Sequence, residues 1–327
     1  IFSVQCIKQY GYSNTRNITY GNRCTAGSMW NNYLPNPHFV ESFETATGEK
    51  FNWDNYLPGY STMKEKERVV FFLRDGLSAA EKERMAAYGA DMSKYLDSGN
   101  EARIKKAYES RDPRLQMAVI TPYAQYNGAS SGIAHTYTLR WPYRGSDSAE
   151  PFDIRTDTND KFYYLWRKFV PEGLEQTERD TYGLDIPLIR YAEVLLLKAE
   201  ALNEWGSTHE SEAIRCVNEV RRRAGHVELN NATYPATKVN GQSDLRERIR
   251  NEYYWEIGGE DSMYFHELRW GTWKDKKFDN NRNGLMQMWG ETTYTWYWLG
   301  DQCWSWPIPA KEMEMNSNLE QNEGWIN

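Results

Sequence analysis

The clearest pattern along the chain is a run of apolar residues that recur every three or four positions between residues 185 and 206. That spacing places them on one face of an α-helix, with polar residues on the other face. Gly206 follows the run, at the position where many helices end on a glycine. The sequence therefore predicts an amphipathic helix whose apolar face consists of Ile189, Ala192, Leu195, Leu196, Ala199 and Leu202.

A second helix is predicted over residues 209–225, where the same spacing recurs and Gly225 closes the run. The short connection between the two helices predicts an antiparallel pair, which resembles one tetratricopeptide-like repeat. A single repeat cannot bury both of its faces, so we expect its stacking partners to come from chain beyond the sequence given. A third helix is predicted from Ser243 through residues 244–257.

The remaining segments are less regular. Residues 78–115 are rich in Ala, Glu, Lys and Arg, and we expect a helical segment there with Ser78 as its N-cap. Residues 1–62 and 117–180 mix rings with Gly, Asn and Pro, which is typical of loops and short strands, and residues 161–170 are the most strand-like run. In residues 293–300 and 303–306, two sets of side chains alternate with the period of a strand, which predicts a hairpin that ends at Pro307.

These patterns predict a mostly α (α+β) fold, in which tetratricopeptide-like helix pairs pack against an irregular, loop-rich region with short strands. We expect residues 1–180 to form an irregular, aromatic-rich, ligand-facing region with one helical segment. Residues 181–327 should form a helical region with a terminal hairpin. The length of 327 residues is compatible with one continuous domain that joins the two regions.

Charge and motifs narrow the classes of function. The net charge of -7 provides no basic stripe, so we expect no nucleic-acid partner. The four cysteines include no Cys-x-x-Cys pair, and Cys6 and Cys24 are either free thiols or one disulfide. Residues 279–284 match the first half of a calcium loop, but Gly290 occupies the position of its bidentate Glu, so we predict no metal site and no cofactor.

Several separated motifs resemble the SusD/RagB family of outer-membrane nutrient-binding lipoproteins. They include "RDPRL" at 111–115, "RKF" at 167–169, the two helices from Arg190 to Gly225, and "WPIPAKEMEMNSNLEQNEGW" at 306–325. The chain departs from the family pattern around 252–271. There Glu252, Glu256 and Glu260 remain, whereas Tyr253, Asp261, Met263 and His266 replace the usual partners, which we interpret as a changed structural network.

The resemblance implies a function in nutrient capture. Family members bind oligosaccharides, or in some cases peptides, and cap a TonB-dependent barrel of the SusC type. It further implies a surface-exposed protein at the cell outer membrane, lipid-anchored through an N-terminal segment that precedes the residues given, with roughly the first half of the protein absent. We therefore expect a glycan-binding protein and no enzyme. A peptide-binding member is the alternative, and a glycoside hydrolase is a second alternative.

Two aromatic clusters in the first region are candidates for the ligand site. Rings can stack on the C–H faces of sugars, and neighbouring planar polar side chains can bridge hydroxyl groups. The alternative is that these rings only anchor irregular loops in the core. The expected ligand-binding residues are Trp30, Asn32, Tyr33, Trp53, Asp54, Asn55 and Tyr56.

A third aromatic cluster lies near the C-terminus, in "YTWYWLGDQCWSWPIP" at 294–309. Because "WPIP" belongs to the terminal motif, we expect the tryptophans of this stretch mainly to pack in the protein. Tyr297 alternates with them and is the ring that we expect to face solvent. No catalytic residue is predicted in this stretch or elsewhere.

Overall fold

The computed structural model describes residues 1–25, 31–130, 133–146, 148–156, 161–173, 182–278 and 284–325. The chain forms two compact units. Unit 1 consists of Ile1–Glu260 and Met286–Glu291, and unit 2 consists of Asp261–Leu285 and Thr292–Asn327. The division therefore falls after Glu260, and the boundary predicted after residue 180 lies inside unit 1.

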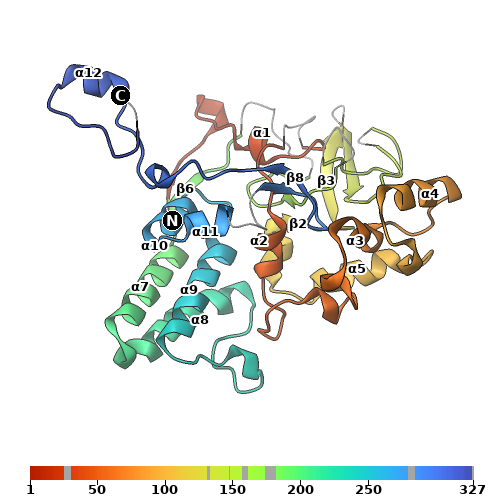
Figure 1. The fold of residues 1–327 in the computed structure, drawn as a ribbon, viewed down its shortest axis with the longest axis horizontal. Helices are drawn as coiled ribbons and strands as arrows, with labels where there is room; N and C mark the ends of the chain where they lie inside the picture. The colour runs from red at the N-terminus through yellow and green to blue at the C-terminus, as the bar shows by residue number, and fades with distance from the viewer. Residues whose placement is uncertain are drawn as a thin grey trace. The chain divides into compact units, whose positions relative to one another are not determined.

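Unit 1 is mostly helical, as predicted, and several of its helices lie within residues 1–180, where a single helical segment was expected (Figure 1). Its helices are α1 (Arg16–Tyr20), α2 (Pro37–Ser42), α3 (Glu65–Phe72), α4 (Ala79–Tyr88), α5 (Asn100–Glu109), α6 (Pro113–Ala118), α7 (Tyr191–Trp205), α8 (Glu210–Ala224) and α9 (Gln242–Ile257).

The strands of unit 1 are short and form two-stranded antiparallel ladders. β1 (Phe2–Val4) pairs with β6 (Ile186–Ile189), and β2 (Val119–Ile120) pairs with β5 (Leu165–Trp166). The strand-like run at 161–170 thus contributes only the two residues of β5. The longest ladder joins β3 (Gln125–Ser130) to β4 (Ile133–Thr138), with Gln125 opposite Thr138.

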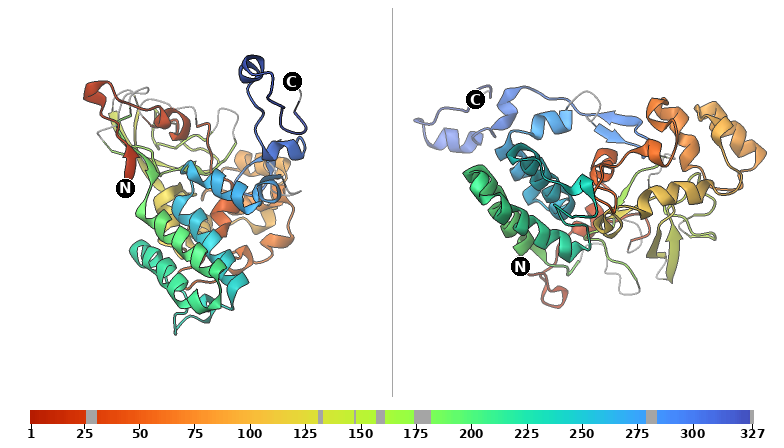
Figure 2. Two further views of the ribbon diagram at one scale, coloured as in Figure 1. Left: turned by 90° about the vertical axis from the view of Figure 1, so that its left-hand side faces the viewer. Right: turned by 90° about the horizontal axis from the view of Figure 1, so that it is seen from below.

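The three predicted helices of the second half are confirmed. The carbonyl of Leu202 accepts a hydrogen bond from the N–H of Gly206 at the end of α7, and Gly225 ends α8 in the left-handed conformation at a φ of 74°. The buried positions of α7 include Leu195, Leu196 and Ala199 of the predicted stripe. In Figure 2 the green α7 and the teal α8 run side by side, and α9 packs against α7 as well.

The N-terminus of α4 also follows the sequence prediction. The hydroxyl of Ser78 accepts a hydrogen bond from the N–H of Glu81, and the Glu81 carboxylate accepts one from the N–H of Ser78. This reciprocal capping box satisfies backbone donors that an uncapped helix leaves open. The helical region from 78 to 115 is divided into α4, α5 and α6 rather than continuous.

Aromatic residues contribute many of the side chains in the core of unit 1. The indole of Trp53 stacks on the ring of Tyr60 with centroids 4.8 Å apart, and the edge of Tyr108 meets it at 5.8 Å. Trp289 is fully buried and stacks against Phe162. Cys6 and Cys24 are both buried and form no disulfide with each other, so the disulfide alternative does not hold.

Charged residues from distant segments meet in a buried network in unit 1. The fully buried carboxylate of Glu252 accepts hydrogen bonds from Nη1 of Arg114 at 2.6 Å and from Nε of Arg221 at 2.9 Å. Arg114 also binds Asp112 at 2.6 Å, and Arg221 binds Glu44 at 2.9 Å. Burial raises the pKa of Asp112, but the hydrogen bonds and charge of Arg114 outweigh it and hold that pKa below its usual value.

The same network extends to Glu256 and Glu260, the other two glutamates that match the family pattern. Arg190 binds Glu256 at 2.8 Å and Glu260 at 2.7 Å, and Nζ of Lys168 binds Glu260 at 2.6 Å. Burial works against ionisation of Glu256, yet Arg190 and Arg114 hold its pKa below the usual value. Charged residues of three segments that carry the family resemblance, 111–115, 167–169 and 190–225, therefore form this buried network.

Unit 2 contains α10 (Ser262–Trp270), α11 (Trp273–Phe278), β7 (Gly284–Met286) except for its last residue, β8 (Thr292–Thr295) and α12 (Ala310–Met315). The predicted terminal hairpin is wrong. β8 pairs with β7, and residues 301–304 form a 3-10 helix instead of a strand. Alternation identified the strand, but its partner β7 is only three residues long and shows no alternating pattern of its own.

The C-terminal tryptophans of unit 2 divide into two groups. Trp298 and Trp304 are half-buried and their centroids lie 5.3 Å apart, in agreement with a packing role. Trp296 and Trp306 are exposed, Trp306 to 70%, so the expected packing role does not hold for them in this chain. Tyr297 is exposed, as predicted.

Candidate functional site

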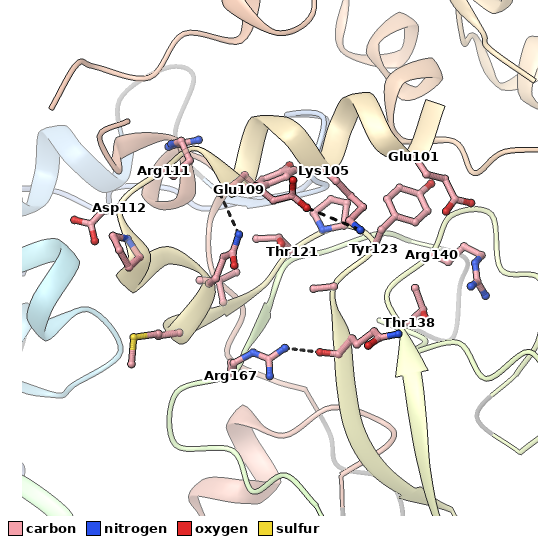
Figure 3. A pocket seen from close by; sticks show the side chains of 18 residues that line it. Glu101, Lys105, Glu109, Arg111, Asp112, Thr121, Tyr123, Thr138, Arg140 and Arg167 are labelled. Carbon is pink, nitrogen blue, oxygen red and sulfur yellow. Dashed lines mark hydrogen bonds and ion pairs between the residues drawn. The ribbon is translucent and has the colours of Figure 1, made fainter. Parts of the chain in front are cut away.

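The candidate site is a polar groove in unit 1 between α5, α6, the loop that precedes β3, and the end of β4. Its volume is about 900 Å³, within the range that small-molecule sites occupy. Figure 3 shows α5 along one side of the groove and the β3–β4 ladder along the other.

The side chains of α5 form a charged rim. Glu101, Lys105 and Glu109 follow one another at intervals of four residues, which places them on one face of the helix. All three line the groove (Figure 3). Nζ of Lys105 lies 3.9 Å from a carboxylate oxygen of Glu109, and Glu101 accepts a hydrogen bond from the N–H of Asp75.

Arginines stand on the opposite side of the groove. Arg140 pairs with the fully buried Asp153, which also accepts hydrogen bonds from the N–H groups of Arg144 and Gly145. Arg167 pairs with Glu172 and donates to the carbonyl of Gln125. These contacts fix both guanidinium groups at the edge of the groove, where Figure 3 shows Arg167 below α5 and Arg140 beside β4.

Two buried tyrosines form part of the floor. The hydroxyl of Tyr108 lies 2.6 Å from that of Tyr164, and the hydroxyl of Tyr123 donates to the carbonyl of Phe72 at 2.6 Å. Tyr123 has a φ of 63°, a conformation that non-glycine residues rarely adopt. Burial raises the pKa of both phenols well above the usual value, so they remain neutral hydrogen-bonding groups.

Arg111 lines the groove at the start of α6 but its guanidinium is directed into the protein. It is 3% exposed, donates to the carbonyls of Phe43 and Val40, and lies 3.5 Å from the ring centroid of Phe51. Burial lowers the pKa of Arg111 to about 10. Its role is therefore to join the floor of the groove to the loop at 43–51.

The outer edge of β3, next to the groove, has its backbone groups occupied. Arg167 binds the carbonyl of Gln125, Glu172 accepts from the N–H of Asn127, and the N–H of Gly173 donates to the carbonyl of Asn127. An extended peptide binds by adding itself to free backbone groups of a strand edge. This edge does not offer those groups at residues 125 and 127.

The rim therefore presents hydrogen-bond donors and acceptors side by side. Lys and Arg groups only donate, carboxylates only accept, and the amides of the exposed Gln116 and Gln125 do both. A hydroxyl group also donates and accepts. The groove is thus suited to a ligand that carries many hydroxyl groups.

The first predicted cluster is only partly described. Trp30 lies outside the described residues. The backbone N–H groups of Asn32 and Tyr33 both donate to the carbonyl of Thr19, and both side chains are exposed. The ring of Tyr33 is 57% exposed and lies 5.4 Å from the ring of Tyr20, so it is held in place and open to solvent.

The second predicted cluster includes one residue that cannot act as expected. Trp53 is 6% exposed, its ring is enclosed by Tyr60, Phe51 and Tyr108, and its Nε1 donates to Glu41 at 2.7 Å. The expectation that this indole stacks on a ligand is therefore corrected, because neither face is accessible. Trp53 instead supports Tyr108 from behind the groove.

The residues after Trp53 remain accessible to different degrees. Asn55 is exposed, Asp54 is half-buried, and Tyr56 is half-buried against the ring of Phe51. Hydrogen bonds from Ser61 lower the pKa of Asp54. Tyr33 contacts Tyr20, whereas Tyr56 contacts Phe51, so the two predicted clusters are anchored by different partners.

Sequence patterns did not identify the groove. Its charged residues come from segments as far apart as Glu101 and Arg167, and only the tertiary fold brings them together. Two signals were present: the motif "RDPRL" begins at the floor residue Arg111, and the acids and the lysine of α5 recur every four residues.

Among the residues that the structure describes, no three His, Cys, Asp or Glu side chains are grouped so that they could hold a metal ion. The candidate calcium loop at 279–284 lies outside the described residues except for Gly284. None of the described helices has the length and apolar character needed to cross a membrane.

In comparisons with known proteins, the chain is similar to proteins of the SusD family. The sequence profile of the SusD family matches residues 1–325. SusD-like protein P38 of Formosa agariphila is 32% identical over 139 residues, which are 42% of this chain and 24% of that protein. Starch-binding protein SusD of Bacteroides thetaiotaomicron is 28% identical over 161 residues, which are 49% of this chain and 25% of that protein.

Solved structures show the same fold. A SusD-like protein of Bacteroides fragilis superposes with a TM-score of 0.59 at 19% identity, over 99% of this chain and 54% of that one. A SusD-like carbohydrate binding protein of the same organism gives a TM-score of 0.58 at 20% identity, over 98% of this chain and 54% of that one. The chain thus spans about half the length of these two proteins.

Proposed function

Because the chain belongs to the SusD family, we propose that it is part of a cell-surface protein that binds glycans and delivers them to a TonB-dependent importer of the SusC type. The observation that carries the proposal is the family match over residues 1–325, together with a relative named as starch-binding. Capture and delivery require no covalent chemistry, so we propose no catalytic role. We place the protein at the outer membrane, anchored through a lipid near its N-terminus.

The groove between α5 and β4 supports glycan binding in physical terms. Its rim alternates groups that donate and groups that accept, and vicinal hydroxyls of a sugar need both. The occupied edge of β3 favours a glycan over an extended peptide at this place. We assign the exposed amides of Gln116 and Gln125 to ligand hydroxyls.

The loop residues Asn32 and Tyr33 are proposed as a further contact region. Tyr33 offers an exposed ring backed by Tyr20, and a ring contact adds about 1 kcal/mol to binding. Asp54, Asn55 and Tyr56 are proposed in the same sense, as polar groups and a ring that a glycan could reach. A few such contacts predict dissociation constants between millimolar and micromolar.

The test is calorimetric titration of the longer protein with a panel of neutral oligosaccharides and peptides. We expect heat of binding with an oligosaccharide, a loss of about tenfold in affinity in the variant Gln116→Ala/Gln125→Ala, and unchanged oligosaccharide length after incubation. Gln9→Ala is the matched control, because Gln9 is exposed in unit 1 and does not line the groove.

Other outcomes would decide against parts of the proposal. Binding of peptides but of no oligosaccharide would replace glycan capture by peptide capture. Oligosaccharide binding that the groove variant retains but Tyr33→Ala loses would move the site to the loop at 32–33. Shortened oligosaccharide products would show that the protein is an enzyme.

A further inference from the structure

We infer that the groove between α5 and β4 selects uncharged glycans and discriminates against glycans that carry carboxylate or sulfate groups. The inference rests on the proposed function and makes its ligand class more specific. Its basis is that Lys105, Arg140 and Arg167, the cations at the edge of the groove, are already paired with carboxylates of the protein.

Three arginines line the groove. Arg140 and Arg167 are each paired with an acid, whereas the guanidinium of Arg111 is buried and directed into the protein, where it donates to backbone carbonyls. Asp153, the partner of Arg140, is fully buried and is held by two backbone N–H groups, so it cannot move away to release the guanidinium. Glu172, the partner of Arg167, lies five residues further along the chain. An anionic ligand would have to compete with these carboxylates for the same donors.

The lysine of the rim is placed between two acids. Glu101 precedes Lys105 by four residues and Glu109 follows it by four, so a carboxylate lies one helical turn away on each side. The α5 rim therefore has a net negative charge of one. A ligand carboxylate that approaches Lys105 meets repulsion from both neighbours.

A neutral sugar avoids both costs. Its hydroxyls can donate to Glu101 and Glu109 and accept from Lys105 and Arg167 without displacing an ion pair. No net charge has to be removed from water. The arrangement of matched charges thus favours polyhydroxylated ligands without ionic groups.

The test compares galactose oligosaccharides with galacturonate oligosaccharides of the same length, titrated into the longer protein at low and high salt. We expect the neutral ligand to bind at least tenfold more tightly, with an affinity that changes less than twofold between about 50 and 500 mM salt. If the site does not accept galactose units, the same comparison is made with glucose and glucuronate units.

The variant Glu172→Gln provides a second test, in which binding of the charged ligand relative to the neutral one should increase. Removal of this carboxylate frees Arg167, so the ratio of uronate to neutral affinity should rise by roughly two- to fivefold. Glu83→Gln is the matched control, since Glu83 is exposed on α4 and does not line the groove, and it should leave the ratio unchanged.

Three results would overturn the inference, and they are distinguishable. Tighter binding of the uronate by the unmodified protein, with strong salt dependence, would show that the groove selects acidic glycans. A ratio that does not respond to Glu172→Gln would show that Arg167 does not control selectivity. If no oligosaccharide of either charge binds, the proposed function itself fails.

Discussion

Replacing Glu252 by glutamine should destabilise the protein far more than an exposed substitution of the same kind. The Glu252 carboxylate is fully buried and joins Arg114 at 2.6 Å to Arg221 at 2.9 Å. Glutamine keeps the shape of the side chain but removes its charge. Both guanidinium groups then remain buried with one carboxylate fewer between them.

The expected loss follows from the contacts of the two arginines. Removal of one member of a buried ion pair costs about 3–5 kcal/mol. Because Arg114 keeps Asp112 and Arg221 keeps Glu44, we expect the lower end, about 3 kcal/mol. With a denaturant dependence of about 3 kcal/mol per molar urea, the midpoint of unfolding should fall by roughly 1 M.

The assay is equilibrium unfolding in urea, followed by tryptophan fluorescence. Glu204→Gln is the control, since Glu204 pairs with Arg246 at the surface and such pairs contribute about 0–1 kcal/mol. If Glu252→Gln shifted the midpoint no further than Glu204→Gln, the buried network would not stabilise the fold.

Three further predictions concern the framework. The pKa values of Asp112 and Glu256 lie below their usual 3.8 and 4.5, so the unfolded chain binds more protons than the folded protein. The stability that these two carboxylates contribute should be complete above about pH 5 and should be lost as pH falls through the lowered pKa values. Urea midpoints measured at pH 7, 5 and 3.5 would detect or refute this loss. Trp53→Ala should cost about 3–5 kcal/mol in urea unfolding because the indole fills the core, whereas an unchanged midpoint with lost glycan binding would return Trp53 to the ligand site. Ser78→Ala should cost about 1 kcal/mol through loss of the N-cap of α4, and a loss below 0.3 kcal/mol, on the order of measurement error, would contradict that role.

Local signals predicted part of the fold. Local sequence was sufficient to predict the apolar stripe of α7, the glycine that ends α8 and the N-cap of α4, because each depends on residues within a few positions of one another. The helical stretch at 78–115 was recognised by composition, which does not show where α4 ends and α5 begins. β8 pairs with β7, which lies just before it in the chain but has only three residues, too few for an alternating pattern to reveal it, and so the predicted hairpin was wrong.

The site was predicted less well, for a related physical reason. An indole beside polar residues suits both a ligand platform and a core anchor, and only the placement of Tyr60 and Tyr108 around Trp53 decides between them. The groove is assembled from α5, α6, β4 and Arg167, and tertiary structure alone brings them together. By contrast, the ring of Tyr33 is exposed, and its role in ligand binding stays a prediction.

Glycan binding in the groove is best tested by a crystal structure of the protein with a neutral oligosaccharide that binds it in solution. We expect sugar density in the groove, with hydroxyl groups within hydrogen-bond distance of Gln116, Gln125 and Arg167. Sugar density at another surface, with the groove free of ligand, would contradict it.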